Sequence, residues 1–86
     1  WSQLALLINE GIRGTKDGLR QDDSVQILIH IDRGGDNGGC RWFFDNLISQ
    51  NVTFDIIGLS FYPWWHGTLT DLQANINDLS QRYNKD

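Results

Sequence analysis

Two apolar segments that end in polar and aromatic side chains constrain what this chain can fold into. The first runs from Val25 to Asp32 and continues into the glycine-rich residues 33–39. The second runs from Asp55 to Tyr62 and continues into Pro-Trp-Trp-His at 63–66. β-Branched and aliphatic residues fill both over about one strand length, which predicts two β-strands. Strands with polar groups at their carboxyl ends are typical of parallel α/β sheets and barrels, whose binding face lies there.

Helical periodicity flanks both predicted strands. Apolar residues recur every three or four positions from the start of the chain, which predicts a helix closed by Gly11 and a loop over 14–24. A large apolar face over Arg41–Gln50 predicts a second helix, entered through a flexible glycine connection and closed by Asn51 in left-handed geometry. An amphipathic period from Leu69 onward predicts a third helix.

The predicted order is helix, strand, helix, strand, helix, and Thr68 is the expected N-cap of the last helix. His30 and Phe61, which are late positions of the two strands, lie 31 residues apart. A barrel of ~250 residues spends about that length on each β/α unit. The predicted fold class is therefore α/β, a partial (β/α)8 TIM barrel of about two and a half units with parallel strands. Because parallel strands need a continued or closed sheet, residues 1–86 are expected not to fold cooperatively alone.

Composition narrows the possible partners. The chain has 86 residues, a formal charge of −4 and 40% hydrophobic residues, as a globular segment does. A mild acidic balance gives no electrostatic reason to bind nucleic acid, and no apolar run is long enough to predict a membrane span. The chain opens with Trp1 and contains no Met, so we expect it to be part of a longer polypeptide. The single Cys40 cannot form an internal disulfide, and a structural thiol is favoured over a nucleophile.

The strand ends carry the candidate functional residues. One strand parity, with Ile29 and Ile57, fits a position facing the helices, which leaves His30, Asp32, Ser60 and Tyr62 on the other face; the last residues of each strand would rise to the rim of a barrel. The small Gly58 and Ser60 would leave room there for bulkier side chains of neighbouring strands. A lone His is also compatible with an ordinary polar residue, and Asp32 and Asp36 with turn formation.

Trp64 and Trp65 follow the second strand directly. Adjacent indoles are costly to expose, and an aromatic face stacks well on a sugar ring while its N–H binds hydroxyls. Burial under a neighbouring loop is the alternative. His66, which follows, is equally compatible with a simple loop residue.

Other kinds of site find little support. The spacing of His30, His66 and Cys40 indicates no metal site, and the glycine loop fits no phosphate-binding pattern, so no metal and no cofactor are expected. Asn9-Glu10 has the form of a glycosidase acid/base pair, but it lies on a predicted helix rather than at a strand end, so Glu10 is interpreted as structural.

Four motifs together resemble a known family. They are Leu-Leu-Ile-Asn-Glu-Gly-Ile-Arg at 6–13, Ile-His-Ile-Asp at 29–32 with Gly-Asp at 35–36, Arg-Trp-Phe-Phe-Asp at 41–45, and Phe-Asp-Ile-Ile-Gly-Leu-Ser-Phe-Tyr-Pro-Trp at 54–64. In this combination the chain is similar to glycoside hydrolase family 53, the arabinogalactan endo-β-1,4-galactanases. The resemblance implies a (β/α)8 barrel that cleaves internal β-1,4-galactosidic bonds of galactan or arabinogalactan with retention, and a secreted, periplasmic or cell-surface location.

The resemblance also implies a register and residue roles. Residues 1–86 would be one part of a single catalytic barrel, from the helix before strand 5 through the helix after strand 6. Both catalytic glutamates, at the ends of strands 4 and 7, would then lie outside this chain, which should be inactive alone. His30 and Tyr62 would support the active site, Tyr62 by a hydrogen bond to the nucleophile. Asp32, Asp36, Trp64 and Trp65 would line sugar subsites. Phe61 departs from the family pattern, where a tyrosine is common, and the connection at 38–40 resembles only some members.

Two alternatives remain open at this point. A carbohydrate-binding or degenerate barrel could keep the aromatic residues without the catalytic carboxylates. A doubly wound nucleotide-binding domain would need a phosphate-binding turn that the glycine loop lacks.

Overall fold

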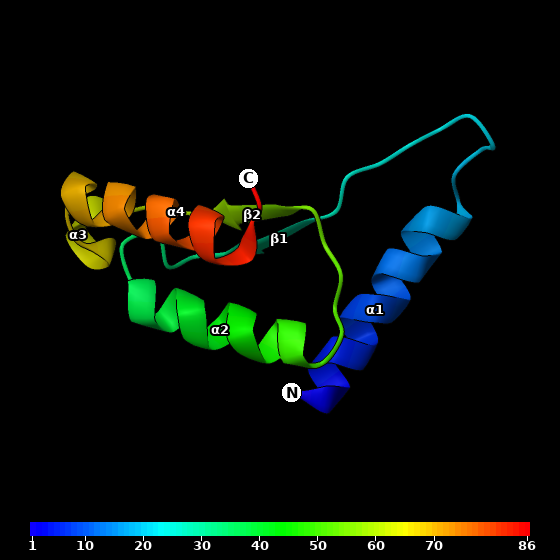
Figure 1. Ribbon diagram of the computed structural model, residues 1–86, viewed down its shortest axis with the longest axis horizontal. Helices are drawn as coiled ribbons and strands as arrows, with labels where there is room; N and C mark the ends of the chain where they lie inside the picture. The colour runs from blue at the N-terminus through cyan, green and yellow to red at the C-terminus, as the bar shows by residue number, and fades with distance from the viewer.

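The computed structural model describes residues 1–86 as four helices and a two-stranded parallel sheet (Figure 1). The elements are α1 (Ser2–Asp17), β1 (Leu28–Ile31), α2 (Asn37–Ser49), β2 (Ile56–Leu59), α3 (Pro63–His66) and α4 (Leu69–Tyr83). β1 and β2 pair in register from Leu28 opposite Ile56 to Ile31 opposite Leu59. The predicted strand–helix–strand unit with parallel strands is therefore confirmed.

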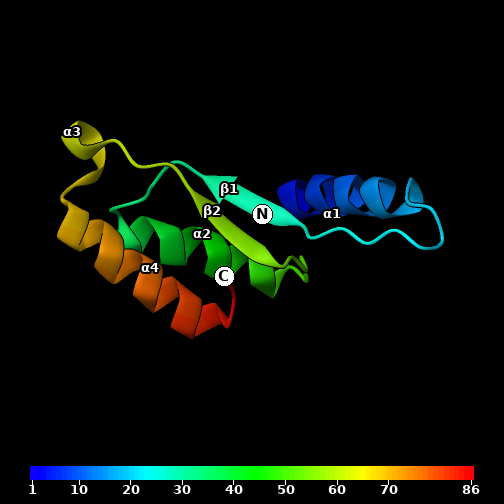
Figure 2. The same cartoon turned by 90° about the horizontal axis from the view of Figure 1, so that it is seen from above.

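Helices α2 and α4 cover one face of the sheet, and the other face carries no helix (Figure 2). Ile27, Ile29, Ile31 and Ile57 pack against the buried core, as the parity of the strands predicted. The alternate positions, Leu28 and His30, are exposed on the bare face.

The core is small and combines aliphatic side chains with two phenylalanine rings. Its buried residues are Ala5 of α1, Phe44 and Leu47 of α2, and Val52 and Phe54 of the segment before β2. The Phe44 ring lies 5.6 Å from that of Phe54, centroid to centroid. Only nine of 86 residues are buried, so most apolar side chains keep contact with solvent.

The first helix is longer than predicted. Gly11 does not end it, because α1 continues through Gly11 and Gly14 to Asp17, with Gly18 as C-cap. Ile12 beyond Gly11 still packs against the core, and Glu10 pairs with Arg13 on the exposed side of the same helix. A glycine that costs helix stability is tolerated where packing on both sides of it continues.

The glycine connection before α2 was also predicted wrongly in part. Residues 37–40 are helical, because the Asp36 carboxylate caps α2 by accepting a hydrogen bond from the Gly39 N–H at 2.9 Å. The strands are shorter than predicted, four residues each, since only one neighbour pairs with each of them.

The residues at the ends of α2, α3 and α4 adopt the backbone and capping geometry that is typical of their residue types. Asn51 has the predicted left-handed backbone, with φ of 62°, just after α2. Thr68 caps α4 as predicted and forms a reciprocal capping box with Asp71. The short helix α3 was not predicted; Pro63 ends the strand but also begins this turn of helix, where its missing N–H costs nothing.

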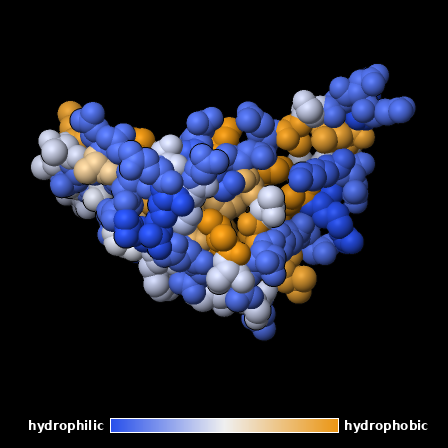
Figure 3. All heavy atoms as spheres, viewed as in Figure 1, coloured by the Kyte–Doolittle hydropathy of each residue, from blue (hydrophilic) through white to orange (hydrophobic).

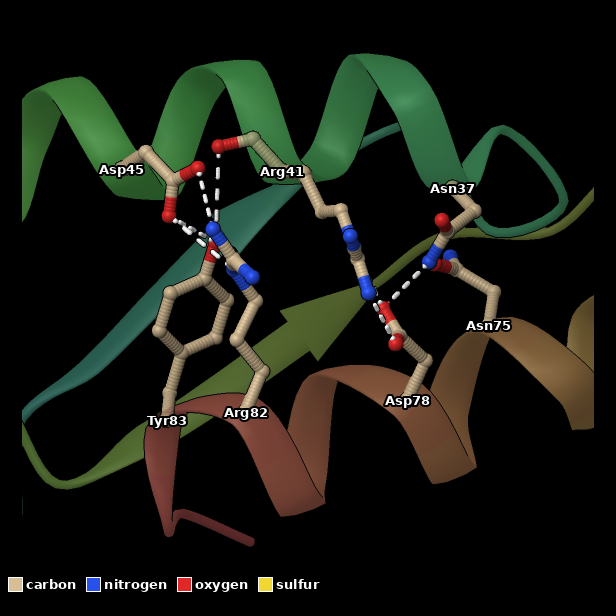
Figure 4. Close-up of polar contacts among 7 residues, drawn as sticks. All are labelled: Asn37, Arg41, Asp45, Asn75, Asp78, Arg82 and Tyr83. Carbon is tan, nitrogen blue, oxygen red and sulfur yellow. Dashed lines mark hydrogen bonds and ion pairs between the residues drawn. The ribbon is translucent and has the colours of Figure 1, made fainter.

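Polar side chains join α2 to α4 along one side (Figure 4). Asp78 accepts hydrogen bonds from Arg41 and Asn37, and Asp45 accepts from Arg82 and from the Tyr83 hydroxyl at 2.7 Å. Hydrogen bonds from Arg82 and Tyr83 hold the pKa of Asp45 below its usual value, and burial together with Asp45 raises the pKa of Tyr83 to about 12.

Helix α1 lies to one side of the α2–α4 pair and is joined to β1 by a long extended segment (Figure 1). Leu6 and Leu7 on this helix are 61% and 70% exposed. Apolar atoms also reach the surface between α1 and α4 in Figure 3. None of the helices is both long and apolar enough to cross a membrane.

Candidate functional site

The segments that follow β1 and β2 lie together at the carboxyl end of the sheet, beside α3 (Figure 2). Pairing continues past the strands, since the Ser60 N–H donates to the Ile31 carbonyl at 3.0 Å and the Gly34 N–H donates to the Ser60 carbonyl at 2.9 Å. A Cβ at Gly34 would lie 2.7 Å from that carbonyl, so only glycine allows this approach. These contacts place both polar strand ends on one rim.

His30 and Ser60 form the first polar contact of this rim. The His30 Nε2 and the Ser60 Oγ are 2.8 Å apart, on the face of the sheet that the helices leave bare. The neighbouring Gly58 makes room for Leu28, because a Cβ at Gly58 would lie 2.6 Å from the Leu28 side chain. The expectation that Gly58 leaves space for a bulkier neighbour is confirmed.

A hollow of about 260 Å³ opens between the two loops, and it is lined by Asp32, Arg33, Asp36, Trp65 and His66. Arg33 donates to the Asp36 Oδ2 at 2.9 Å. The Gly39 N–H and then the Arg33 guanidinium hold the pKa of Asp36 below its usual value. Asp36 therefore stays ionised while it caps α2 and faces the hollow.

The two loops meet at Gly35. A Cβ at this position would lie 1.5 Å from the His66 carbonyl oxygen, far inside any allowed contact. Glycine at this position is therefore what lets α3 approach the loop that bears Asp32 and Asp36, which sets the width of the hollow.

Exposed aromatic rings surround the second strand end. Tyr62, Trp64 and Trp65 are 47%, 71% and 76% exposed, so burial of the two tryptophans under a loop of this chain is ruled out. Ring centroids lie 5.8 Å apart for Tyr62 and Trp64, and 5.6 Å apart for the two indoles. The result is an open aromatic surface beside the hollow.

The structure brings together some of the predicted site residues but not all of them. Asp32, Asp36 and Trp65 share the hollow, whereas Trp64 lies outside its lining. The hydrogen-bond partner of His30 is Ser60. Glu10 is the only glutamate, and it lies on α1 paired with Arg13, so no glutamate stands at either strand end.

A buried polar cluster that supports the first loop was missed. Asn75 of α4, 1% exposed, donates to the Gly34 carbonyl at 2.8 Å and accepts from Asn37 at 2.9 Å. The Cys40 thiol donates to the Arg33 carbonyl at 3.1 Å, and burial raises its pKa, as suits a structural thiol. Asn75 falls three residues after Leu72 and four before Leu79, so its place on the apolar face of α4 was the signal available in the sequence.

Arg33 and His66 were also missed as members of the hollow. Their positions next to predicted site residues were visible in the sequence. The contact between the two loops depends on Gly35 and could not be seen in the sequence. No three His, Cys, Asp or Glu side chains are grouped so that they could hold a metal ion.

Comparison with known proteins extends this picture. The family described as "Glycosyl hydrolase family 53" matches residues 1–86. An uncharacterised protein of Niallia circulans is 51% identical over 85 residues, and an arabinogalactan endo-β-1,4-galactanase of Thermothelomyces thermophilus is 30% identical over 92 residues. These alignments cover 99% and 100% of this chain but only 22% and 27% of the two relatives, so the chain spans about a quarter of their length.

Solved structures give the same result. A "GH53 catalytic domain" of Ignisphaera aggregans superposes with a TM-score of 0.87 at 37% identity, over 100% of this chain and 23% of that one. A fungal β-1,4-galactanase superposes with a TM-score of 0.88 at 30% identity, over 100% of this chain and 27% of that one. Both are TIM barrels, so the unit described above is part of a (β/α)8 barrel. Because the family match extends over every residue, the chain belongs to glycosyl hydrolase family 53.

Proposed function

We propose that this chain is part of a retaining endo-β-1,4-galactanase that hydrolyses internal β-1,4-galactosidic bonds of galactan or arabinogalactan. The observation that carries the proposal is the rim at the carboxyl end of the sheet, where carboxylates and exposed indoles lie together in a chain of family 53. Indole faces stack on sugar rings, and carboxylates accept hydrogen bonds from sugar hydroxyls. A site for a neutral polysaccharide can use both kinds of group, the indole faces for the rings and the carboxylates for the hydroxyls.

The register that we propose makes β1 and β2 strands 5 and 6 of the barrel. Residues 1–86 then form one part of a single catalytic domain, and the two catalytic glutamates stand at the ends of strands 4 and 7. Retaining hydrolysis needs two carboxyl groups about 5–5.5 Å apart. A chain whose only glutamate is Glu10, on an exposed helix, supplies neither, so residues 1–86 alone should be inactive.

Within this scheme the rim residues support and bind rather than cleave. Tyr62 would hydrogen-bond the nucleophile, which orients the carboxylate and favours its ionised form. His30, held by Ser60, would form part of the same wall. Asp32, Asp36, Trp64 and Trp65 would contact the polysaccharide. A secreted, periplasmic or cell-surface location suits a polymer that is too large to enter a cell.

The test is hydrolysis of β-1,4-galactan by the intact protein, with β-1,4-glucan as the control polymer. We expect internal cleavage of the galactan. The products should keep the anomeric configuration of the substrate, which NMR of the reaction mixture would show. In the intact protein, Trp64→Ala should weaken binding of a galacto-oligosaccharide about 30-fold, because an aromatic contact of roughly 2 kcal/mol is lost.

Tyr62→Phe separates support of catalysis from binding. Loss of one preorganised hydrogen bond to a reacting group should lower kcat about 100-fold and leave KM nearly unchanged. If neither variant changes the kinetics, the residue roles are wrong. If the wild-type protein binds galactan but does not cleave it, a non-catalytic carbohydrate-binding barrel is the better description.

A further inference from the structure

His66 is held in a way that leaves one ring nitrogen for a ligand. The ring Nδ1 of His66 accepts a hydrogen bond from the Tyr62 backbone N–H at 3.0 Å, and the backbone N–H of His66 donates to the Tyr62 carbonyl at 2.8 Å. A ring nitrogen that accepts must be unprotonated, so in the neutral ring the proton is on Nε2. Nε2 has no hydrogen-bond partner within the chain and is therefore a donor that folding leaves unused.

Two aromatic rings and one backbone contact hold His66 in place. Its ring centroid lies 5.6 Å from the Tyr62 ring and 6.3 Å from the Phe61 ring. The His66 backbone lies against Gly35, where no side chain would fit. His66 is half-buried by these contacts while its neighbour Trp65 is 76% exposed. A donor held this firmly loses little entropy when it binds a ligand.

The hollow that His66 helps to line offers complementary groups. Asp32 and Asp36 contribute carboxylate acceptors, Arg33 and His66 contribute donors, and Trp65 contributes an aromatic ring. A sugar hydroxyl both donates and accepts, so it is satisfied only where both kinds of group are present. A purely anionic or purely apolar ligand would leave part of this lining unpaired.

We propose that this hollow is a saccharide subsite in which His66 Nε2 donates to a hydroxyl of the sugar residue beside Trp65. This inference rests on the proposed galactanase function and adds a specificity-determining residue to it. His66 acts through direct contact with the substrate, and its Nδ1 keeps the turn that presents Trp64 and Trp65.

Two substitutions in the intact protein separate these roles. In His66→Asn the side-chain oxygen can take the place of Nδ1 and accept from Tyr62, but the distal donor is lost. In His66→Gln the amide reaches the position of Nε2, but the acceptor for Tyr62 is lost. Binding of β-1,4-galactotetraose is measured by calorimetry, and the thermal unfolding midpoint of each variant reports on the turn.

We expect His66→Asn to weaken binding about tenfold with an unchanged unfolding midpoint, and His66→Gln to bind within about threefold of the wild type. Wild-type affinity in His66→Asn would overturn the inference, and so would equal losses in both variants, because His66 would then matter only for the turn. In either case the wild-type protein still binds and cleaves galactan. Absence of binding by the wild type would instead overturn the proposed function together with this subsite.

Discussion

At the scale of single residues, Gly35 decides how the two site loops fit together. We predict that Gly35→Ala destabilises the intact protein by about 1–3 kcal/mol, because the new Cβ would overlap the His66 carbonyl oxygen and one loop must move. The same movement separates Asp32 and Asp36 from Trp65, so KM for galactan, the proposed substrate, should rise. Chemical denaturation and steady-state kinetics measure the two effects.

Gly38→Ala is the matched control for this prediction. Gly38 lies in the first turn of α2, and its nearest neighbour would be 3.8 Å from an added Cβ. Alanine there should be neutral or stabilise by about 0.4–1 kcal/mol. Equal behaviour of the two variants would show that the approach of His66 to Gly35 does not shape the hollow.

At the scale of elements, the contact between α2 and α4 should depend on pH through Asp45. Hydrogen bonds from Arg82 and Tyr83 lower the pKa of this carboxyl in the folded state. A depressed pKa stabilises the fold above the unfolded-state value of about 4, and that contribution is lost as the pH falls through the folded-state value. We therefore predict that the intact protein loses stability below about pH 4, and that Asp45→Asn makes this loss smaller.

Urea unfolding at pH 7 and at pH 3 measures the effect. Asp45→Asn should lower the midpoint at pH 7 and lower it less at pH 3, which is below the unfolded-state pKa, so that part of the wild-type contribution is already lost. Asp22→Asn, an exposed loop position without a hydrogen-bond partner, is the control and should follow the wild type at both values. If the unfolding midpoint of Asp45→Asn depends on pH as that of the wild type does, the loss of stability in acid comes from other carboxyl groups.

Sequence patterns predicted elements better than they predicted element ends. The parity of Ile27, Ile29 and Ile57 and the cap at Thr68 depend on residues close in sequence, so both were predictable. Gly11 was taken as a helix end because the packing of Ile12 beyond it was not visible. The hollow needed the contact between Gly35 and His66, which joins two loops 31 residues apart and depends on the tertiary fold.

At the scale of the whole molecule, residues 1–86 are less compact than an independent domain of the same length. Their radius of gyration is 14.2 Å, whereas a compact domain of this length would have roughly 12 Å. Their accessible surface is 6009 Å², against roughly 5200 Å² for a folded monomer of this mass. The bare face of the sheet and the exposed Leu6 and Leu7 of α1 account for surface that other parts of a barrel would bury.

The outer edge of β2, which pairs with no other strand, shows where such burial would begin. The Ile57 N–H donates to the Asp86 carbonyl at 2.8 Å, and Ile57, Leu59, Ile76 and Leu79 line an apolar groove beside it. A two-stranded parallel sheet with an open edge and one bare face is at most marginally stable.

We predict that the isolated peptide 1–86 gives a broad, non-cooperative thermal transition by circular dichroism and rapid amide exchange in β1 and β2. In the intact protein the same amides should be protected, because the neighbouring strands then pair with both edges. A sharp two-state transition of the monomeric peptide would contradict this prediction, and it would mean that the small core around Phe44 and Phe54 is sufficient for folding.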